Sequence, residues 1–213
     1  MAYSVDRRPG VAGELVLRRS GEHFEIIANG TFLMDTRNGE SERLLVRAAA
    51  DVMPPGAPLL IGGLGVGFSL RAALDHPNVG PVTVVEREPA VIAWNTGPLA
   101  AVHDAALTDP RVTCVEADLI TWLPTHPTPF AAICLDIDNG PEWTVTPGNA
   151  ILYTESGLTL LRDVLTPTGT LAIWSAADST PFTTLLRTHF PHVTTIPIPV
   201  PRGDPDVIFL ARR

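Results

Sequence analysis

Residues 59–68, Leu-Leu-Ile-Gly-Gly-Leu-Gly-Val-Gly-Phe, decide the fold of this 213-residue chain. Three apolar residues lead into a turn in which every second residue is glycine, at Gly63, Gly65 and Gly67. Because glycine has no Cβ, such a turn can adopt positive φ angles and pass close to a ligand. The segment therefore predicts a buried strand, a ligand-binding turn and the beginning of a helix.

The spacing of these glycines separates two classes of nucleotide ligand. Counted from Gly63, the last glycine of a dinucleotide fingerprint, Gly-x-Gly-x-x-Gly, would fall on Phe68. Counted from Gly65, it would fall on Leu70. The motif is therefore Gly-x-Gly-x-Gly, the form associated with S-adenosylmethionine rather than with nicotinamide dinucleotides. A tight strand-to-helix turn that binds nothing is the alternative interpretation.

The order of strand, turn and helix repeats along the rest of the chain. Apolar strands are expected at residues 59–61, 82–85, 112–115, 131–135 and 171–174, with a final pair at 193–200 and 207–210. Helices are expected at residues 39–52, from the glycines to residue 75, from Pro89 onward and at 154–165. Because the central strands are apolar without alternation, the sheet is expected to be parallel and covered by helices on both faces.

The first residues predict a separate small antiparallel unit. Strand patterns occupy residues 14–18, 24–28 and 31–35, and Asn29-Gly30 is a strong signal for a two-residue hairpin. We therefore expect residues 1–37 to form a β-hairpin unit and residues 38–213 to form an α/β domain that binds S-adenosylmethionine.

Charge and composition exclude several classes of protein. The formal net charge is −8, which disfavours nucleic acid as a partner and suits a small cationic ligand. All 15 basic residues are arginine. Without lysine, a pyridoxal phosphate Schiff base, a Walker phosphate loop and a kinase site are excluded.

Neither a metal site nor a membrane segment is expected from the sequence. Cys114 and Cys134 lie in apolar strands and are expected to be buried free thiols, and no histidine or cysteine spacing is typical of metal ligands. The N-terminus lacks the apolar core of a secretory signal. Residues 52–70 are uncharged but contain three prolines and five glycines, which favours a strand and turn over a membrane helix. We therefore expect a soluble cytoplasmic protein.

Acidic residues stand at the ends of the expected parallel strands, where open α/β sheets bind their ligands. Glu86 ends the second strand and can accept hydrogen bonds from ribose hydroxyls. Asp118, after the third strand, can accept a hydrogen bond from an adenine amino group, and Leu119 beside it is assigned to the same ligand. A solvated charge is the alternative interpretation for Glu86, and a helix N-cap is the alternative for Asp118.

The fourth strand ends in two aspartates, Asp136 and Asp138, which raise each other's cost of ionisation. A carboxylate here can take a proton from an amine nucleophile or hold an ammonium group, so both are candidate catalytic residues. Asn139, Trp143 and Tyr153 are candidate substrate contacts, and the rings of Trp143, Tyr153 and Trp174 can add cation–π interactions. A self-capped turn is the alternative for Asp138 and Asn139, and core packing is the alternative for each of the three aromatics.

In these segments the sequence resembles the spermidine synthase (polyamine aminopropyltransferase) family. The similar stretches are residues 59–67, 82–86, 109–112 with Asp118, 130–136, and 152–153 through 169–171. The resemblance implies a Rossmann-like class I methyltransferase fold with a seven-stranded, mostly parallel sheet. It implies intact or decarboxylated S-adenosylmethionine as substrate, methylthioadenosine as leaving group, and a homodimer. It implies that Glu86 binds the ribose, that Asp118 binds the adenine and that Asp136 is the catalytic aspartate.

The sequence departs from the family in the segments that bind the aminopropyl amine and the polyamine. Residues 64–66 carry no Asp where the family holds the aminopropyl amine. Residues 39–43 lack the Tyr-His pair of the polyamine groove, and the Asp-x-x-Asp element becomes Asp136-x-Asp138. The residues therefore support binding of an adenosyl sulfonium better than aminopropyl transfer to a polyamine.

The leading hypothesis is an enzyme that directs a nucleophile to a carbon next to the sulfonium, with Asp136 as base or ammonium holder. Three outcomes stay open within it. These are aminopropyl transfer to an amine, methyl transfer to a small molecule, and cyclisation or elimination within S-adenosylmethionine itself. A catalytically silent binding protein on the same fold is the alternative from another class.

Overall fold

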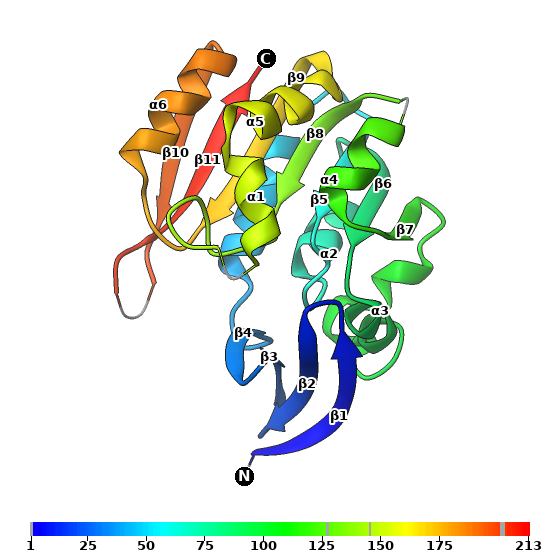
Figure 1. Ribbon diagram of the computed structural model, residues 1–213. Coiled ribbons are helices and arrows are strands. Elements are labelled where there is room, and N and C mark those ends of the chain that lie inside the picture. Colours follow the sequence, from blue (N-terminus) through cyan, green and yellow to red (C-terminus); the bar gives the residue numbers. More distant parts are fainter. Residues whose placement is uncertain (1, 127, 145, 201–202) are drawn as a thin grey trace.

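The computed structural model describes residues 2–126, 128–144, 146–200 and 203–213. These residues form two β-sheets, a four-stranded N-terminal sheet and a seven-stranded sheet that is flanked by helices (Figure 1). In Figure 1 the N-terminal sheet, in blue, lies beyond one end of the strands of the larger sheet.

The N-terminal sheet is antiparallel throughout. Its strands, in both chain order and spatial order, are β1 (Ala2–Gly10), β2 (Gly13–Ser20), β3 (His23–Ala28) and β4 (Thr31–Asp35). Asn29 and Gly30 have φ angles of 49° and 80° and join β3 to β4, which confirms the hairpin expected there. Strand β1 was not expected from the sequence, because its largely exposed side chains give it no apolar pattern.

The larger sheet confirms the expected α/β fold. Its strands are β5 (Ala57–Gly62), β6 (Val79–Glu86), β7 (Val112–Glu116), β8 (Phe130–Leu135), β9 (Leu165–Ser175), β10 (His192–Ile198) and β11 (Asp206–Arg212). The spatial order is β7-β6-β5-β8-β9-β11-β10. The first five strands in this order run parallel, and β11 pairs antiparallel with both β9 and β10.

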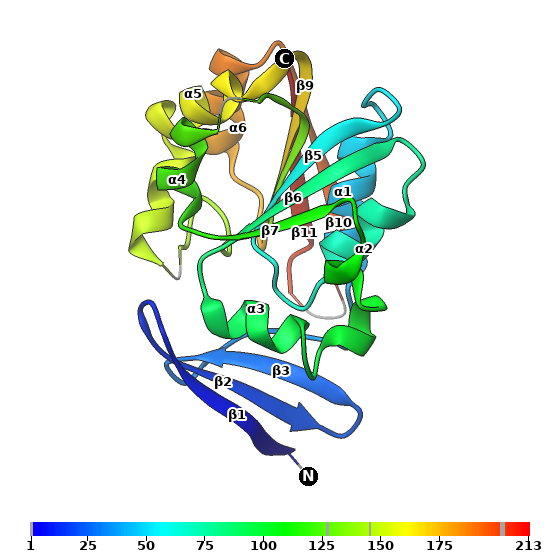
Figure 2. The same ribbon diagram turned by 90° about the vertical axis from the view of Figure 1, so that its right-hand side faces the viewer.

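Helices cover both faces of this sheet. They are α1 (Glu40–Ala50), α2 (Phe68–Asp75), α3 (Pro89–Asn95), α4 (Leu119–Trp122), α5 (Glu155–Asp163) and α6 (Thr180–His189). Short 3₁₀ helices occupy Ala100–His103, Ala106–Thr108, Leu123–Thr125 and Pro147–Tyr153. Figure 2 shows α4, α5 and α6 on one face and α1 and α2 on the other, with α3 next to the N-terminal sheet.

The apolar strands are buried on both sides, as their uninterrupted composition predicts. Leu59 and Ile61 of β5 pack in one hydrophobic core with α1 and α2, whereas Leu60 between them packs in the other core with α4, α5 and α6. Residues 52–70 form β5, the glycine turn and the beginning of α2. No helix in the described ranges is long and apolar enough to span a membrane.

The two cysteines are both free thiols, as expected, but their burial differs. Cys134 in β8 is fully buried, which raises the pKa of its thiol. Cys114 in β7 is only half-buried, and burial raises the pKa of its thiol to about 11. The expectation of burial is therefore wrong for Cys114, because β7 is the edge strand of the sheet.

Candidate functional site

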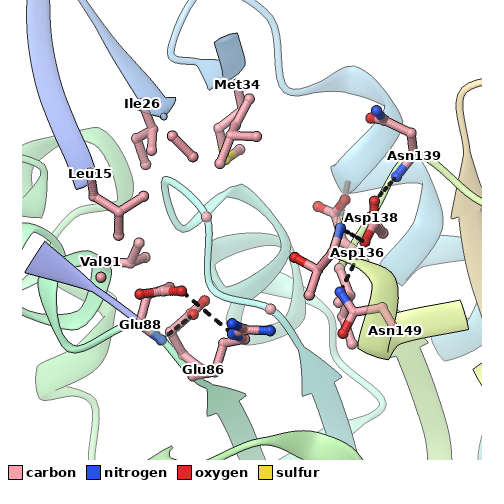
Figure 3. Close-up of a pocket in the computed structure, with 18 of the residues that line it drawn as sticks. Leu15, Ile26, Met34, Glu86, Glu88, Val91, Asp136, Asp138, Asn139 and Asn149 are labelled. Atoms are coloured by element: carbon pink, nitrogen blue, oxygen red, sulfur yellow. Dashed lines mark hydrogen bonds and ion pairs between the residues drawn. The ribbon is translucent and has the colours of Figure 1, made fainter. Parts of the chain in front are cut away.

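A cavity of about 700 Å³ opens at the carboxyl ends of the parallel strands, beneath the N-terminal sheet (Figure 3). This volume is within the range of small-molecule sites. Leu15, Ile26 and Met34 from the N-terminal sheet form its apolar side, and the polar side comes from the ends of β6 and β8. The small antiparallel sheet therefore completes the site that the larger sheet begins.

The glycine turn (residues 63–67) forms the middle of the cavity wall. Gly63, Gly65 and Gly67 have φ angles of 89°, 53° and 88°, which favour glycine at all three positions. A Cβ on Gly63 would collide with the backbone carbonyl oxygen of Asp136, so the turn can approach β8 only with glycine there. Gly63 and Gly65 line the cavity.

Gly67 has a different place from the other two glycines. It immediately precedes α2 and lies behind the wall, where a Cβ would come within 2.5 Å of the His103 ring. Of the three glycines assigned to the ligand, the structure brings Gly63 and Gly65 to the cavity and leaves Gly67 outside its lining.

Glu86, at the end of β6, is fixed by the main chain. Its Oε2 accepts the Leu64 N–H at 2.8 Å and its Oε1 accepts the Glu88 N–H at 2.8 Å. Burial raises the pKa of this carboxyl, and the two main-chain donors oppose that rise. Since each oxygen can accept a second hydrogen bond, Glu86 can still bind two hydroxyl groups of a ligand.

Asp118 and Leu119 stand together where β7 leads into α4, and both line the cavity. Asp118 is the N-cap of α4, with Oδ1 accepting the Thr121 N–H at 3.2 Å. The helix-cap interpretation therefore holds for Asp118, and it leaves the residue on the cavity wall.

Asp136 lies on the opposite side of the glycine turn from Glu86 (Figure 3). Its N–H donates to the Gly62 carbonyl oxygen at 3.0 Å, which fixes the backbone. Its carboxylate accepts no hydrogen bond from the described residues. Burial, together with the negative charges of Glu42 and Asp206, raises the pKa of this carboxyl to about 7.

Asp138 mainly holds the loop that follows β8. Its Oδ1 accepts the Asn139 N–H at 3.0 Å, and its Oδ2 accepts the Thr146 N–H at 3.1 Å and the Asn149 Nδ2 at 2.9 Å. This is the self-capped turn of the alternative interpretation, although Asp138 and Asn139 both line the cavity. The charges that raise the Asp136 pKa come from Glu42 and Asp206, not from Asp138 as the sequence suggested.

Two of the three aromatic candidates, Trp143 and Tyr153, lie outside the cavity lining, whereas Trp174 is part of it. Trp143 is 63% exposed. Tyr153 packs edge to face against Phe182, with 5.5 Å between ring centroids, as the core-packing interpretation predicts. Burial, together with the negative charges of Asp138 and Asp136, raises the pKa of the Tyr153 hydroxyl, so this group lies near the acidic end of the cavity.

Sequence reasoning missed an acidic group that faces Asp136. Glu42 comes from the first turn of α1 and Asp206 from the start of β11, and both line the cavity. The Oδ2 of Asp206 accepts hydrogen bonds from the Ser41 hydroxyl at 2.8 Å and the Trp174 indole at 3.2 Å. Burial raises the pKa of the Glu42 carboxyl; the positive charge of Arg43 opposes this, and the negative charge of Asp206 adds to it.

The cavity is strongly acidic as a whole. Its described lining contains one basic side chain, Arg87, and nine carboxylates: Glu14, Asp35, Glu42, Glu86, Glu88, Asp118, Asp136, Asp138 and Asp206. Such a wall attracts cations. Among the described residues, no group of three or more His, Cys, Asp or Glu side chains is arranged to hold a metal ion.

Comparisons with known proteins agree with this geometry, although no family model matches the chain. Over 125 residues it is 34% identical to polyamine aminopropyltransferase 1 of Streptomyces coelicolor, covering 58% of this chain and 23% of that protein. Over 174 residues it is 29% identical to the polyamine aminopropyltransferase of Mycobacterium tuberculosis, covering 79% of this chain and 32% of that protein.

Solved structures extend the similarity to nearly the whole chain. A spermidine synthase in complex with the transition-state analogue AdoDATO superposes with a TM-score of 0.81 at 19% identity, covering 98% of this chain and 73% of that one. The chain therefore has the fold of spermidine synthases. The spermidine synthase from Thermotoga maritima superposes with a TM-score of 0.78 at 17% identity, covering 98% of this chain and 72% of that one.

The resemblance inferred from sequence is thereby confirmed, and so is the methyltransferase-like fold. The chain spans about a quarter to a third of the length of the curated relatives described above.

Proposed function

We propose that the chain transfers an aminopropyl group from decarboxylated S-adenosylmethionine to a small amine and releases methylthioadenosine. The observation that carries this proposal is a single cavity with two different ends. Glu86, Asp118 and the glycine turn suit an adenosine at one end, and the group around Asp136 suits cations at the other. A sulfonium between the two ends would connect them.

At the adenosine end, the protein offers mostly fixed acceptors. Glu86 would accept hydrogen bonds from the ribose hydroxyls, and its geometry is set in advance by the Leu64 and Glu88 N–H groups. Asp118 would accept a hydrogen bond from the adenine amino group, and Leu119 would pack against the base. Such preorganisation lowers the entropic cost of aligning the reacting carbon.

At the acidic end, Asp136 would accept a proton. The amine lone pair attacks the methylene carbon next to sulfur, and the electron pair of the breaking C–S bond stays on sulfur as a neutral thioether. An amine that arrives as ammonium must first lose a proton, and a carboxylate with a pKa of about 7 is well suited to accept it near neutral pH. Glu42 and Asp206 would hold the positive charge of the acceptor nearby.

The same charge distribution favours the decarboxylated donor over the intact one. The aminobutyrate of S-adenosylmethionine carries a carboxylate, and the acidic end of the cavity would repel it. Cyclisation, elimination and methyl transfer, which use intact S-adenosylmethionine, are therefore less well supported. The names of the relatives, polyamine aminopropyltransferase and spermidine synthase, support the same choice.

The test is product analysis by mass spectrometry. The protein is incubated with S-adenosylmethionine or its decarboxylated form, each alone and with putrescine, and the Asp136→Asn variant serves as control. We expect methylthioadenosine and an aminopropylated amine only with the decarboxylated donor and putrescine together. Methylthioadenosine without an acceptor would instead establish cyclisation or elimination, and adenosylhomocysteine would establish methyl transfer. If calorimetry detects binding of neither donor, the enzyme hypothesis is wrong.

A further inference from the structure

Two buried polar residues hold the glycine turn from the side that faces away from the cavity. Asn95, the last residue of α3, donates from Nδ2 to the Gly65 carbonyl oxygen at 2.8 Å and to the Val91 carbonyl oxygen at 2.9 Å. Its side chain is almost completely buried. It therefore ties a cavity-lining glycine to the helix behind it.

His103 supports the next glycine of the turn by contact. A Cβ on Gly67 would lie 2.5 Å from Cδ2 of the His103 ring, so this fully buried ring occupies the space beside the glycine. Its Nδ1 accepts the Ala106 N–H at 3.0 Å, so the neutral ring carries its proton on Nε2. Burial lowers the pKa of His103, which keeps the ring neutral.

The backbone after His103 is strained in a way that holds the ring in place. Asp104 and Ala105 both adopt left-handed conformations, with φ angles of 52° and 53°. Residues other than glycine occupy this region at an energetic cost, and such strain persists only where the surrounding structure fixes it. Here the hydrogen bond from Ala106 to the His103 ring closes the strained turn.

We propose that Asn95 and His103 are positioning residues that fix the glycine turn in the conformation that binds adenosine. Neither residue lines the cavity, so each acts through a glycine and not through the ligand. The Asn95 Oδ1 is buried without a partner among the described residues, and the His103 ring interacts with the backbone of Asn95. An apolar side chain at either position would leave the Gly65 carbonyl or the Ala106 N–H without its partner, so the two polar side chains serve the backbone around the turn. The ligand named here rests on the proposed function.

The first experiment measures the turn directly, without a ligand. Asn95→Asp replaces the donor to Gly65 with an oxygen that repels the carbonyl. We expect backbone amide hydrogen exchange at Leu64 and Gly67 to become about tenfold faster, because the loss of one hydrogen bond shifts the opening equilibrium of the turn by about this factor. Asn78→Asp is the matched control, because Asn78 donates to the Ala50 carbonyl oxygen at 3.1 Å and does not line the cavity.

The second experiment removes the ring and keeps its hydrogen bond. In His103→Asn the shorter amide retains an acceptor for the Ala106 N–H but leaves the space beside Gly67 empty. We expect affinity for 5′-methylthioadenosine, measured by calorimetry, to fall about tenfold in both His103→Asn and Asn95→Asp. Because Asn95 is buried and Asn78 is partly exposed, the free energy of unfolding should fall more in Asn95→Asp than in the Asn78→Asp control, so exchange and affinity are measured under conditions in which both variants remain folded.

These outcomes separate the two proposals. If exchange in the turn stays at the wild-type rate in both variants, Asn95 and His103 do not position it, whatever the ligand. If exchange rises but affinity for methylthioadenosine is unchanged, the positioning has no part in ligand binding and the inference is wrong. If the wild-type protein does not bind methylthioadenosine, the proposed function fails. The exchange rates still decide whether Asn95 and His103 fix the conformation of the glycine turn.

Discussion

The two ends of the cavity each present a carboxylate at the end of a parallel strand, but the protein surrounds the two groups differently. Glu86 at the end of β6 accepts one main-chain N–H on each oxygen. Asp136 just after β8 accepts no hydrogen bond from the described residues and faces the negative charges of Glu42 and Asp206. Burial raises the pKa of both carboxyls, and only Glu86 has donors that oppose the rise.

This difference separates an acceptor from a proton-exchanging group. A carboxyl held by two N–H groups keeps its position and can accept further hydrogen bonds from hydroxyls. A carboxyl with a pKa of about 7 changes its protonation near neutral pH, which suits a general base. In the proposed function, the same strand-end position thus serves binding on one side of the glycine turn and chemistry on the other. Substitutions at four positions test this difference between the two ends.

The largest effect is expected for Asp136→Asn. We expect aminopropyl transfer to fall by about 10²- to 10⁴-fold, because the amine loses its proton acceptor. Below a pH of about 7 the wild-type carboxyl is protonated and cannot accept a proton, so wild-type activity should rise as the pH increases through this value. The pH dependence of kcat/KM measures both effects. Asp163→Asn, at an exposed position on α5, should leave rate and pH profile unchanged, and a wild-type profile in Asp136→Asn would contradict the assignment.

Glu86→Gln tests the other end of the cavity. The amide can accept only one of the two main-chain N–H groups and directs its own donors at the second. We expect the affinity for methylthioadenosine, measured by calorimetry, to fall about a hundredfold. A loss of this size corresponds to the free energy that a hydrogen bond to a charged group contributes. Glu116→Gln, at the end of the adjacent strand and outside the cavity lining, should bind as the wild type does. Equal affinities in the two variants would refute the ribose assignment.

Asp206→Asn removes a charge from the acidic end while keeping an acceptor for Ser41 and Trp174. We expect the KM for the amine to rise about tenfold, with affinity for methylthioadenosine unchanged. Because one negative charge near Asp136 is gone, the midpoint of the pH–rate profile should move to lower pH. Asp178→Asn, an exposed residue outside the cavity lining, is the control. A loss of methylthioadenosine affinity in Asp206→Asn would mean that the two ends are not separate.

The smallest effect is expected at Asp118, where capping and binding coincide. Asp118→Ala should lower the free energy of unfolding by about 1 kcal/mol, because α4 loses its N-cap. Asp118→Asn keeps an oxygen that can cap the helix and should be close to the wild type in urea unfolding. If both variants bind methylthioadenosine as tightly as the wild type does, Asp118 is a helix cap alone and makes no contact with adenine.

Much of the fold is encoded locally and could be predicted from the sequence. The continuous apolar run of β5 predicts a strand buried on both faces, and Asn29-Gly30 predicts the hairpin. Two elements have no such signal. The side chains of β1 are almost all exposed, and α6 begins at a Ser179 cap that the apolar pattern does not mark.

The candidate site was predictable only where the residues follow their strands. Glu86, Asp118 and Asp136 lie on the cavity because the carboxyl ends of parallel strands meet at one edge. Glu42 and Asp206 reach Asp136 from segments far apart in the sequence, and no local pattern relates such positions. Trp143 and Tyr153 lie close to the strand end in the sequence, but one points to solvent and the other packs in the core.

The most direct test of the two-ended cavity is a crystal structure with bound 5′-methylthioadenosine. We predict ribose hydroxyls on the Glu86 carboxylate, the adenine beside Asp118, and the thioether sulfur directed at Asp136. A nucleoside in the reverse orientation, or bound away from residues 63–67, would contradict this prediction.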